Sequence, residues 1–266
     1  MRRIVIDDAW KPLDNCGSKG FQRKWYNERE NLYVKEGLKY TYPSKDYYVE
    51  VLSTAILRQL NIPGIRYADY SCCEIVCKGA ASIGCVSPNF LRSNEVLVTL
   101  HVLNSIAAIG RPIRSGDVTE TLLNILNLFL YFGVEHYNEY LAVMFLVDYL
   151  LVNIDRHQYN INVIFNKKTK QYTIAPLFDF GYGLLQSGDM PNALSLEEKV
   201  KYLRYEPFDE PFDMILELFM YQGYIQKYIP SVLDVSGLIF PERDALILFL
   251  RQCNKLGIKV IRDRRK

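Results

Sequence analysis

The chain has 266 residues, a mass of 31.0 kDa and a formal net charge of +2. Its 49% hydrophobic content is that of a globular protein, and the nearly balanced charge excludes a protein that binds nucleic acid over its whole surface. No segment has the length and apolarity of a bilayer span or a signal peptide. We therefore expect a soluble, cytoplasmic protein. Secretion by a route that uses no signal peptide is the alternative. The six cysteines lack zinc-ligand spacing, which favours reduced thiols.

The N-terminal part of the chain is rich in strand patterns and punctuated by glycine. The first clear strand is Asn31–Lys35. A helix is predicted at Lys45–Leu60, with Ser44 as its possible N-cap. Shorter strands are predicted at Ile65–Tyr70, Cys73–Cys77 and Ser82–Val86.

The rest of the chain follows mainly helical periodicity. A β-hairpin interrupts it, pairing Ile161–Phe165 with Gln171–Ile174. A strand-rich region 1–86 followed by a helical region 87–266 predicts an α+β fold with two lobes, and ligands favour such junctions. The predicted helices are Ser93–Ile109, Asp117–Phe132, Tyr137–Val152, Leu194–Leu203, Asp209–Gln222 and Glu242–Leu256.

Asp148 falls on the apolar face of the predicted helix Tyr137–Val152. An unpaired charge on a buried face is costly, so Asp148 needs a partner, and backbone amides of the following turn could supply one. The pattern fits both a structural aspartate at a helix end and a catalytic one.

Asp155 and Asn160 lie on one tight loop before the hairpin, and Asp179 follows the hairpin, two residues before Gly181. Phosphoryl transfer from ATP needs a carboxylate that positions the acceptor hydroxyl and oxygen ligands that hold Mg²⁺ against the phosphates. Hard oxygen donors thus converge from two adjacent loops, and Gly181 allows a sharp turn. The joint pattern predicts a phosphotransferase centre between Asp155 and Gly181 in a protein-kinase-like, two-lobed fold.

Each of these residues also has a simpler interpretation. Asp155 and Asn160 could only form a turn, and Asp179 could be an ordinary loop aspartate. His157 is interpreted as a structural histidine that braces the loop, with a general-base role as the alternative.

Lys35, at the end of the first clear strand, is placed to contact nucleotide phosphates, and Glu50 on the next helix could pair with it. The alternative for both residues is a surface charge. The segment Asn15–Lys24, which precedes this strand, is rich in glycine, small and basic residues. It matches neither a Walker A nor a G-x-G-x-x-G loop. Its backbone amides could cradle phosphates at Gly17 and Gly20, with charge from Lys19, Arg23 or Lys24.

Four segments together resemble the HipA-like serine/threonine kinases, and their compact, CtkA-like branch in particular. The resemblance implies that Asp155 is the catalytic aspartate, that Asn160 and Asp179 are metal ligands, and that Lys35 is the ATP-phosphate lysine. ATP and Mg²⁺ are the implied cofactors. The four segments are Leu32–Lys35, Tyr47–Glu50, Asn153–Asn160 and Pro176–Gly181.

The same resemblance implies autophosphorylation of a serine in the phosphate-binding loop, which maps to Ser18. It also implies a nucleotide hinge near Cys85–Ser87 whose backbone would bond adenine. The loop differs from the family's usual small-residue–Gln-Pro-Lys form, and the extra N-terminal subdomain of the longer HipA toxins has no counterpart here. An antitoxin-type partner is therefore possible but unsupported. The expected ATP-binding residues are Lys35, Glu50, Gly17, Ser18, Lys19, Cys85 and Ser87.

The sequence therefore predicts an ATP-dependent protein serine/threonine kinase that autophosphorylates and acts on an unnamed protein substrate. A phosphoinositide-type lipid kinase shares the Asp-Arg-His-x-x-Asn loop and the Asp-Phe-Gly triplet, but only the short basic tail Arg262–Lys266 could face a membrane. A small-molecule phosphotransferase is a further alternative. A nucleotide-binding pseudokinase is the non-enzyme alternative, and the presence of Lys35, Asp155, Asn160 and Asp179 argues against it.

Overall fold

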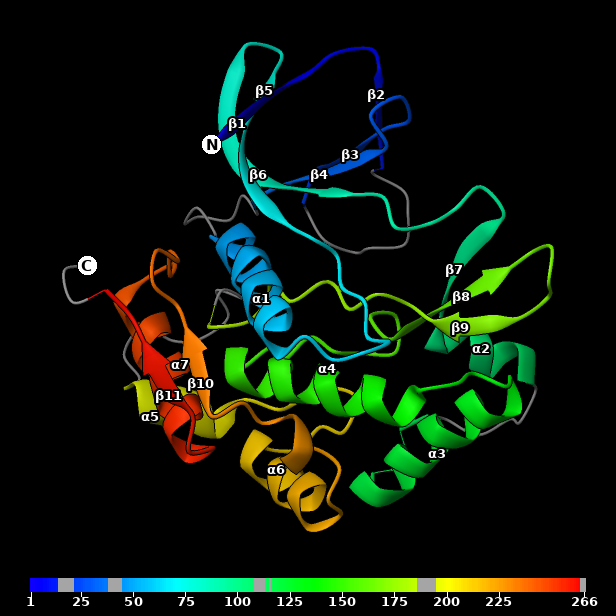
Figure 1. Cartoon of the computed structure of the whole chain (residues 1–266), viewed down its shortest axis with the longest axis vertical. Helices are drawn as coiled ribbons and strands as arrows, with labels where there is room; N and C mark the ends of the chain where they lie inside the picture. Colours follow the sequence, from blue (N-terminus) through cyan, green and yellow to red (C-terminus); the bar gives the residue numbers. More distant parts are fainter. Residues whose placement is uncertain (14–21, 38–44, 108–112, 115, 186–194, 264–266) are drawn as a thin grey trace.

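The small lobe is a curled sheet of six strands in the order β1-β5-β6-β4-β3-β2 (Figure 1). All neighbouring strands are antiparallel except the pair β1 and β5. The computed structural model describes residues 1–13, 22–37, 45–107, 113–114, 116–185 and 195–263. The strands are β1 Arg2–Ile6, β2 Trp10–Pro12, β3 Lys24–Asn27, β4 Leu32–Glu36, β5 Ser71–Cys77 and β6 Ala80–Pro88.

The two faces of this sheet have different tasks. Residues from β1 to β6 form a separate small core on one face, which includes Trp25, Val34 and Ile75. Helix α1 (Asp46–Leu60) packs against β5 and β6. Because side chains alternate along a strand, Lys35 points to the face opposite Val34. The sheet therefore directs Lys35 away from its own core.

Gly84 allows β6 to lie close to β4. A Cβ atom at this position would stand 2.1 Å from the carbonyl oxygen of Lys35 and 2.7 Å from Cδ1 of Ile75. The backbone angle φ of Gly84 is not positive, so this glycine is required by space and not by conformation. The turn from β5 to β6 is different, since Lys78 and Gly79 both have positive φ, as a two-residue hairpin turn needs.

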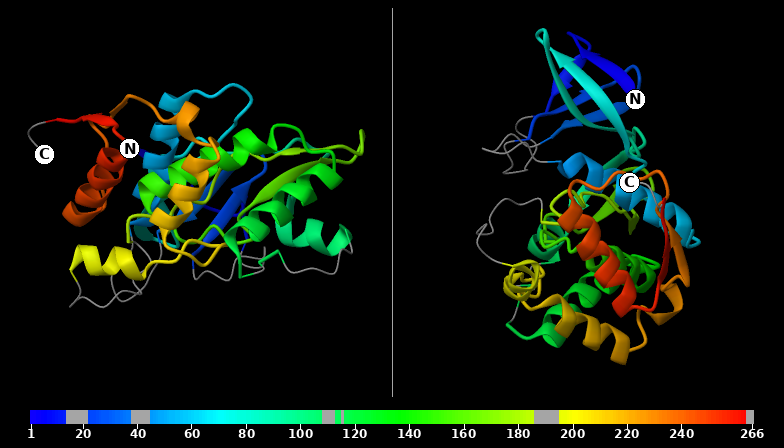
Figure 2. Two further views of the ribbon diagram at one scale, coloured as in Figure 1. Left: turned by 90° about the horizontal axis from the view of Figure 1, so that it is seen from below. Right: turned by 90° about the vertical axis from the view of Figure 1, so that its left-hand side faces the viewer.

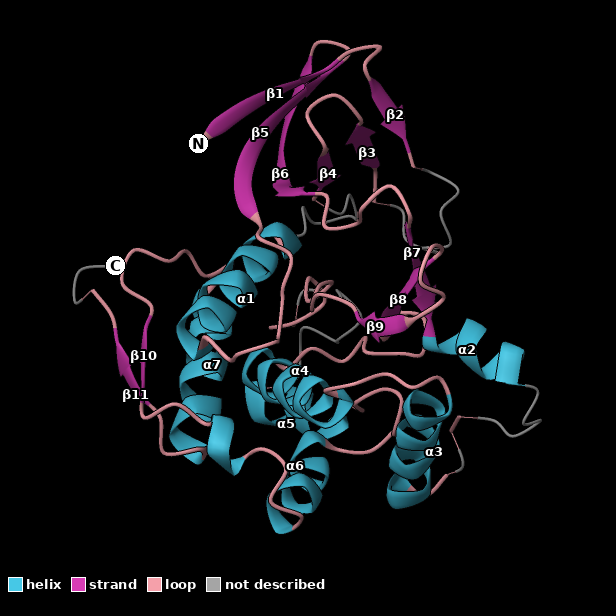
Figure 3. Ribbon diagram, turned by 45° about the vertical axis from the view of Figure 1, so that its right-hand side comes forward, coloured by secondary structure: helices cyan, strands magenta, loops and turns pink. Residues whose placement is uncertain are grey.

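The large lobe surrounds α4, which lies beneath α1 and the small lobe (Figures 1 and 2). A three-stranded sheet in the order β7-β8-β9 lies at the side of the large lobe (Figure 3). The helices are α2 Leu100–Ala107, α3 Val118–Tyr131, α4 Tyr137–Leu151, α5 Leu196–Tyr202, α6 Phe212–Tyr221 and α7 Arg243–Lys255. The remaining strands are β7 Glu95–Thr99, β8 Asn162–Asn166, β9 Tyr172–Ile174, β10 Val232–Asp234 and β11 Lys259–Ile261, and a short 3₁₀ helix covers Gln226–Tyr228.

Helix α4 is the centre of the main core. Every residue from Tyr140 to Leu151 is buried, and α1, α3, α6 and α7 pack around the helix. A helix that is apolar on all sides belongs in a core of this kind. Within the described ranges, none of the helices has both the length and the apolarity to cross a bilayer.

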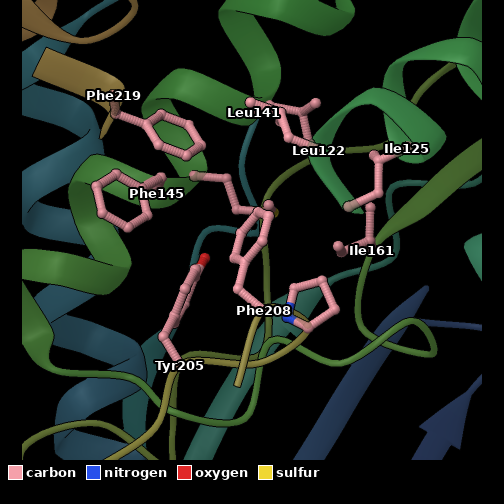
Figure 4. A pocket seen from close by; sticks show the side chains of 10 residues that line it. Leu122, Ile125, Leu141, Phe145, Ile161, Tyr205, Phe208 and Phe219 are labelled. Atoms are coloured by element: carbon pink, nitrogen blue, oxygen red, sulfur yellow. The ribbon is translucent and has the colours of Figure 1, made fainter. Parts of the chain in front are cut away.

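A small, apolar cavity of about 10 Å³ lies between α3, α4 and the segment around Tyr205 (Figure 4). This volume is close to the minimum for one water molecule, and far below the few hundred Å³ of a ligand pocket. The cavity is therefore a packing defect of the large-lobe core. Its lining residues are Leu122, Ile125, Leu141, Met144, Phe145, Ile161, Tyr205, Pro207, Phe208 and Phe219.

The predicted two-lobed α+β fold is confirmed, with corrections at two elements. The predicted helix Ser93–Ile109 is wrong in its first half, because the β-branched run of β7 pairs with β8 before α2 begins. The predicted strand Ile65–Tyr70 is also wrong. This segment makes one isolated bridge, between Tyr67 and Leu177, and otherwise connects α1 to β5.

The other predicted elements also compare with the structure in different ways. The expected hairpin is present as β8 and β9, and the helix after it begins at Leu196. Strands β1, β2, β3, β10 and β11 were not predicted. The domain boundary after residue 86 stays a prediction, and β6 runs on to Pro88. The possible N-cap Ser44 lies outside the described residues, and α1 is preceded by Lys45.

Replacing Gly84 by alanine should destabilise the small lobe. The new methyl group would overlap the backbone of β4, so we expect a loss of about 1–3 kcal/mol in the free energy of unfolding. Urea unfolding measures this loss. The neighbouring substitution Ile83→Ala, at a side chain that is 39% exposed, should change stability by less than about 1 kcal/mol. Equal effects of the two substitutions would contradict the account of Gly84.

Candidate active site

Lys35 forms the central contact between the two lobes. Its Nζ lies 2.5 Å from Oδ1 of Asp179 and also donates a hydrogen bond to Oε1 of Glu50. The second carboxylate oxygen of Glu50 accepts a hydrogen bond of 3.0 Å from the backbone N–H of Phe180. Strand β4, helix α1 and the segment after β9 thus meet at one ammonium group, and the structure brings together three of the residues that the sequence predicted.

The charges in this cluster shift one another's pKa. Burial lowers the pKa of Lys35, but Asp179 and Glu50 overcome this effect and hold the pKa well above its usual value. Burial raises the pKa of Glu50. Burial would also raise the pKa of Asp179, but Lys35 and then Lys24 hold it below its usual range. Asp179 is therefore an anion at neutral pH, as a metal ligand must be.

The sequence predicted a sharp backbone turn at Gly181, but the turn occurs at Asp179. The residue in the left-handed region is Asp179 itself, with φ 64°, and not Gly181. A Cβ atom on Gly181 would lie 3.3 Å from Oε1 of Glu50 and 3.4 Å from Cβ of Asp46. A side chain at position 181 would thus be in tight contact with α1, and the sharp turn occurs two residues earlier.

Asp155 and Asn160 are held together within one loop. The side-chain amide nitrogen of Asn160 donates to the carbonyl oxygen of Asp155 at 2.7 Å and to its Oδ2 at 3.3 Å. The oxygen of the same amide is the atom that can coordinate a cation. The side chain of Asp155 is 35% exposed, so an acceptor molecule can reach its carboxylate. Burial, and then the negative charge of Asp179, raise the pKa of Asp155.

Arg156, which the sequence analysis did not single out, ties the two loops to the core. Its Nη1 donates to the carbonyl oxygen of Asn160 at 3.1 Å and to that of Phe178 at 2.9 Å. Its guanidinium also lies over the ring of Phe180, 4.5 Å from the centroid. One side chain therefore sets the spacing between the loop of Asp155 and the loop of Asp179.

The partner that Asp148 requires is Arg156 and not a backbone amide of the following turn. Asp148 Oδ2 lies 2.9 Å from Nε of Arg156, and Oδ1 lies 3.0 Å from Nη2. Asn153 and Tyr205 each donate a further hydrogen bond of 2.7 Å to the same carboxylate. Asp148 and Arg156 are 0% and 1% exposed. Asp148 is thus a buried structural anion, and its demand for a partner was the sequence signal that could have identified Arg156.

His157 lies beside the candidate catalytic carboxylate. Its Nε2 is 3.5 Å from Oδ1 of Asp155, and its ring meets the ring of Tyr159 edge-on at 5.6 Å. Tyr159 in turn packs against His101 at 4.6 Å. The positive form of His157 lowers the pKa of Asp155. The ring contact with Tyr159 lies within the loop, and the choice between a structural and a general-base role for His157 stays a prediction.

The expected hinge residues Cys85 and Ser87 lie on β6 and are both buried. Cys85 pairs with Lys35 on β4 and with Cys72 on β5, so it is inside the sheet. Ser87 is buried and pairs with β4, while β5 begins opposite Val86. Within the described sheet, β6 thus has a neighbour on one side from Ser87 onward. The loop residues Gly17, Ser18 and Lys19 lie outside the described residues.

The oxygen donors of Asp179 and Asn160 fit a hard divalent cation. Asp179 offers carboxylate oxygens and Asn160 an amide oxygen, which are the ligand types that Mg²⁺ takes in combination with phosphate oxygens and water. Among the described residues, no three His, Cys, Asp or Glu side chains gather into a cluster that would hold a metal without other ligands. A cation at this place would therefore depend on the nucleotide for part of its coordination.

Comparison with known proteins supports the fold. No family model matches the chain, and no curated protein matches it. The crystal structure of a Helicobacter pylori proinflammatory kinase, CtkA, is similar, with a TM-score of 0.56 and 17% sequence identity over 95% of this chain and 94% of that one. The chain therefore has the two-lobed fold of a kinase. At this identity the likeness concerns the fold alone.

Replacing Asp148 by alanine should destabilise the protein strongly. The change leaves the buried Arg156 guanidinium without its carboxylate, which costs about 3–5 kcal/mol when one partner of a buried pair is removed. The matched control is Asp69→Ala, because Asp69 pairs with Arg58 at 2.7 Å on the surface. Such a pair contributes at most about 1 kcal/mol. Urea unfolding of both variants tests the difference, and similar losses would refute the structural role of Asp148.

Proposed function

We infer that the protein is an ATP-dependent, Mg²⁺-requiring phosphotransferase of the HipA-like type, which phosphorylates a serine or threonine hydroxyl of a protein and also itself. The observation that carries this proposal is the contact of Lys35 with both Glu50 and Asp179. It joins a small-lobe strand, a helix and a large-lobe loop at one point, next to a loop that carries Asp155 and Asn160. This arrangement suits a nucleotide whose phosphates lie between the lobes.

Each residue has a separate task in the proposed reaction. Lys35 presents positive charge to the phosphates, and Glu50 fixes the direction of the lysine side chain. Asn160 and Asp179 would hold Mg²⁺. The cation would stabilise the negative charge that develops on the transferred phosphoryl group. Asp155 positions the acceptor hydroxyl and takes its proton while the new O–P bond forms and the bond from the γ-phosphorus to the leaving ADP oxygen breaks. Burial of this cluster strengthens the electrostatic contributions.

The choice of a protein acceptor rests on motif resemblance. The segments Leu32–Lys35, Asn153–Asn160 and Pro176–Gly181 have the order and spacing of the HipA-like serine/threonine kinases. The similar CtkA structure is described as that of a kinase, which agrees with phosphoryl transfer and names no acceptor. A phosphoinositide or a small molecule would use the same centre with a different acceptor site.

Loss of the candidate catalytic residues should abolish transfer of phosphate from labelled ATP. We expect Asp155→Ala to reduce the rate by about 10²–10⁴-fold, because general-base assistance is lost. Asp179→Ala should reduce it at least as much, since a metal ligand is lost. Asp69→Ala, at an exposed residue, serves as the control. Activity that survives in both site variants would refute the proposed centre.

The acceptor is identified by mass spectrometry of protein produced with an intact Asp155 and with Asp155→Ala. A phosphorylated serine or threonine that is present in the first sample and absent from the second would support autophosphorylation. Incubation with a general protein substrate and with phosphoinositide vesicles tests the acceptor class. Label that enters only the lipid would overturn the protein-kinase proposal and leave the phosphotransferase proposal intact.

The activity should also depend on pH through Asp155. Because burial and Asp179 raise the pKa of Asp155, its carboxylate form is lost at a higher pH than for an ordinary aspartate of pKa about 3.9. The acid limb of the kcat/KM profile should lie correspondingly higher. His157→Gln removes a positive charge that lowers the pKa of Asp155, so this limb should move further up. His136→Asn, far from Asp155 in sequence and on the exposed surface, should leave the profile unchanged. A profile that does not move in His157→Gln would contradict this assignment.

A further inference from the structure

Two cysteines lie directly opposite each other in the small-lobe sheet. Cys72 of β5 pairs with Cys85 of β6 in the antiparallel register. Cys85 also pairs with Lys35 of β4, so both thiols are on the face of the sheet that carries Lys35. Helix α1 packs against the hairpin formed by β5 and β6 (Figure 1). The proposed phosphoryl transfer uses neither thiol.

The turn between β5 and β6 determines the geometry of this pair. The two strands are joined by a two-residue turn, and the pair next to it is Cys77 with Ala80. In such a hairpin the pair next to the turn is hydrogen-bonded, and hydrogen-bonded and non-hydrogen-bonded pairs then alternate. Cys72 and Cys85 form the sixth pair from the turn, which is therefore non-hydrogen-bonded. The Cα atoms of such a pair are about 4.5 Å apart, a distance that a disulfide spans.

The other cysteines that the structure describes are placed differently. Cys73 is buried in the core on the opposite face of the sheet, and Cys77 packs against the same core. Their cross-strand partners are a glycine and an alanine. Cys253 is buried in α7 of the large lobe. Within the described ranges, Cys72 and Cys85 are thus the one pair of thiols that the sheet sets face to face.

The two thiols differ in their access to solvent. Cys85 is 1% exposed, whereas Cys72 is partly exposed and can meet a small oxidant. Both are free thiols in the structure. Burial raises the pKa of both thiols, so each is mostly protonated at neutral pH and reacts slowly. The first oxidation step therefore belongs to Cys72, and Cys85 lies in place for the second.

We propose that Cys72 and Cys85 form a reversible cross-strand disulfide when the protein meets hydrogen peroxide. The thiolate of Cys72 attacks one peroxide oxygen, the O–O bond breaks, and Cys72 becomes a sulfenic acid. The sulfur of Cys85 then attacks the sulfur of Cys72, the S–S bond forms, and the hydroxyl leaves as water with the proton of Cys85. In sum, two thiols and one peroxide give one disulfide and two waters, and the two electrons that the sulfur atoms lose reduce the peroxide. A thiol reductant reverses the reaction.

The cross-link should stabilise the small lobe. It closes the hairpin on which α1 packs, and it restricts the unfolded chain between positions 72 and 85. The stability of the sheet that carries Lys35 then depends on the oxidant around the protein. This inference concerns the thiols alone and is independent of the proposed phosphoryl transfer.

Peptide mapping of the full-length protein tests the cross-link. The protein is treated with hydrogen peroxide, its remaining thiols are alkylated, and it is digested with trypsin. Cleavage at Lys78 separates the peptide 67–78 from the peptide 79–92, so a disulfide between Cys72 and Cys85 holds the two together until dithiothreitol is added. Cys72→Ser and Cys85→Ala should both abolish the joined peptides. Cys77→Ser is the matched control and should keep them, because Cys77 is on the same strand and faces the other core.

A melting curve tests the geometry of the cross-link. The oxidised wild type should melt roughly 4–10 °C above the reduced protein, and Cys72→Ser treated in the same way should not. No joined peptides, or joined peptides that persist in Cys72→Ser, would overturn the assignment. A protein that carries the cross-link and melts no higher than the reduced form would contradict the unstrained fit. Neither measurement uses ATP, so a failure of the phosphotransferase proposal would leave both results standing.

Discussion

The buried ion pair between Asp148 and Arg156 is the interaction on which the rest of the site depends. A carboxylate at the end of α4 is tolerated in the core because a guanidinium, an amide and a phenol satisfy it. The guanidinium is held in place by this carboxylate, and its remaining nitrogen binds the carbonyl groups of Asn160 and Phe178. The two loops that carry Asp155 and Asp179 therefore take their positions from one apolar helix beneath them.

The small lobe meets this support from above through Lys35. The position of that residue follows from three features of the sheet: the alternation along β4, the close approach allowed by Gly84, and the packing of α1 against β5 and β6. Glu50 connects the ammonium of Lys35 to the backbone of Phe180. The sheet core and the main core are separate, and α1 belongs to the main core while it also packs on the sheet. The charged groups around Lys35 thus add to the apolar contacts of α1 in holding the lobes together.

The residues of the candidate site were easier to find in the sequence than the residues that hold them in place. Asp155, Asn160 and Asp179 carry a spacing that few other functions require, and α4 has a long run of apolar residues that can only be a core helix. Arg156 was overlooked because, in the sequence alone, an arginine next to an aspartate is typical of an exposed pair of charges. Strand β7 was mistaken for helix because its pairing with β8 is a long-range contact, and periodicity does not report such contacts. Lys24 was one of three residues that the sequence offered as charge for the phosphates, and only the strand register shows that it lies opposite Lys35.

Glu50 shows how narrowly one position can be constrained. One oxygen of its carboxylate accepts from the ammonium of Lys35, and the other accepts from the N–H of Phe180. Glutamine has a single acceptor oxygen, so its NH₂ group would have to face one of these two donors. Aspartate has the right charge, but its chain is one methylene shorter and cannot reach both from the same helix. Among the twenty amino acids, only glutamate offers two acceptor oxygens and this reach. Substitutions at position 50 should therefore be tolerated less well than substitutions at the exposed positions of α1.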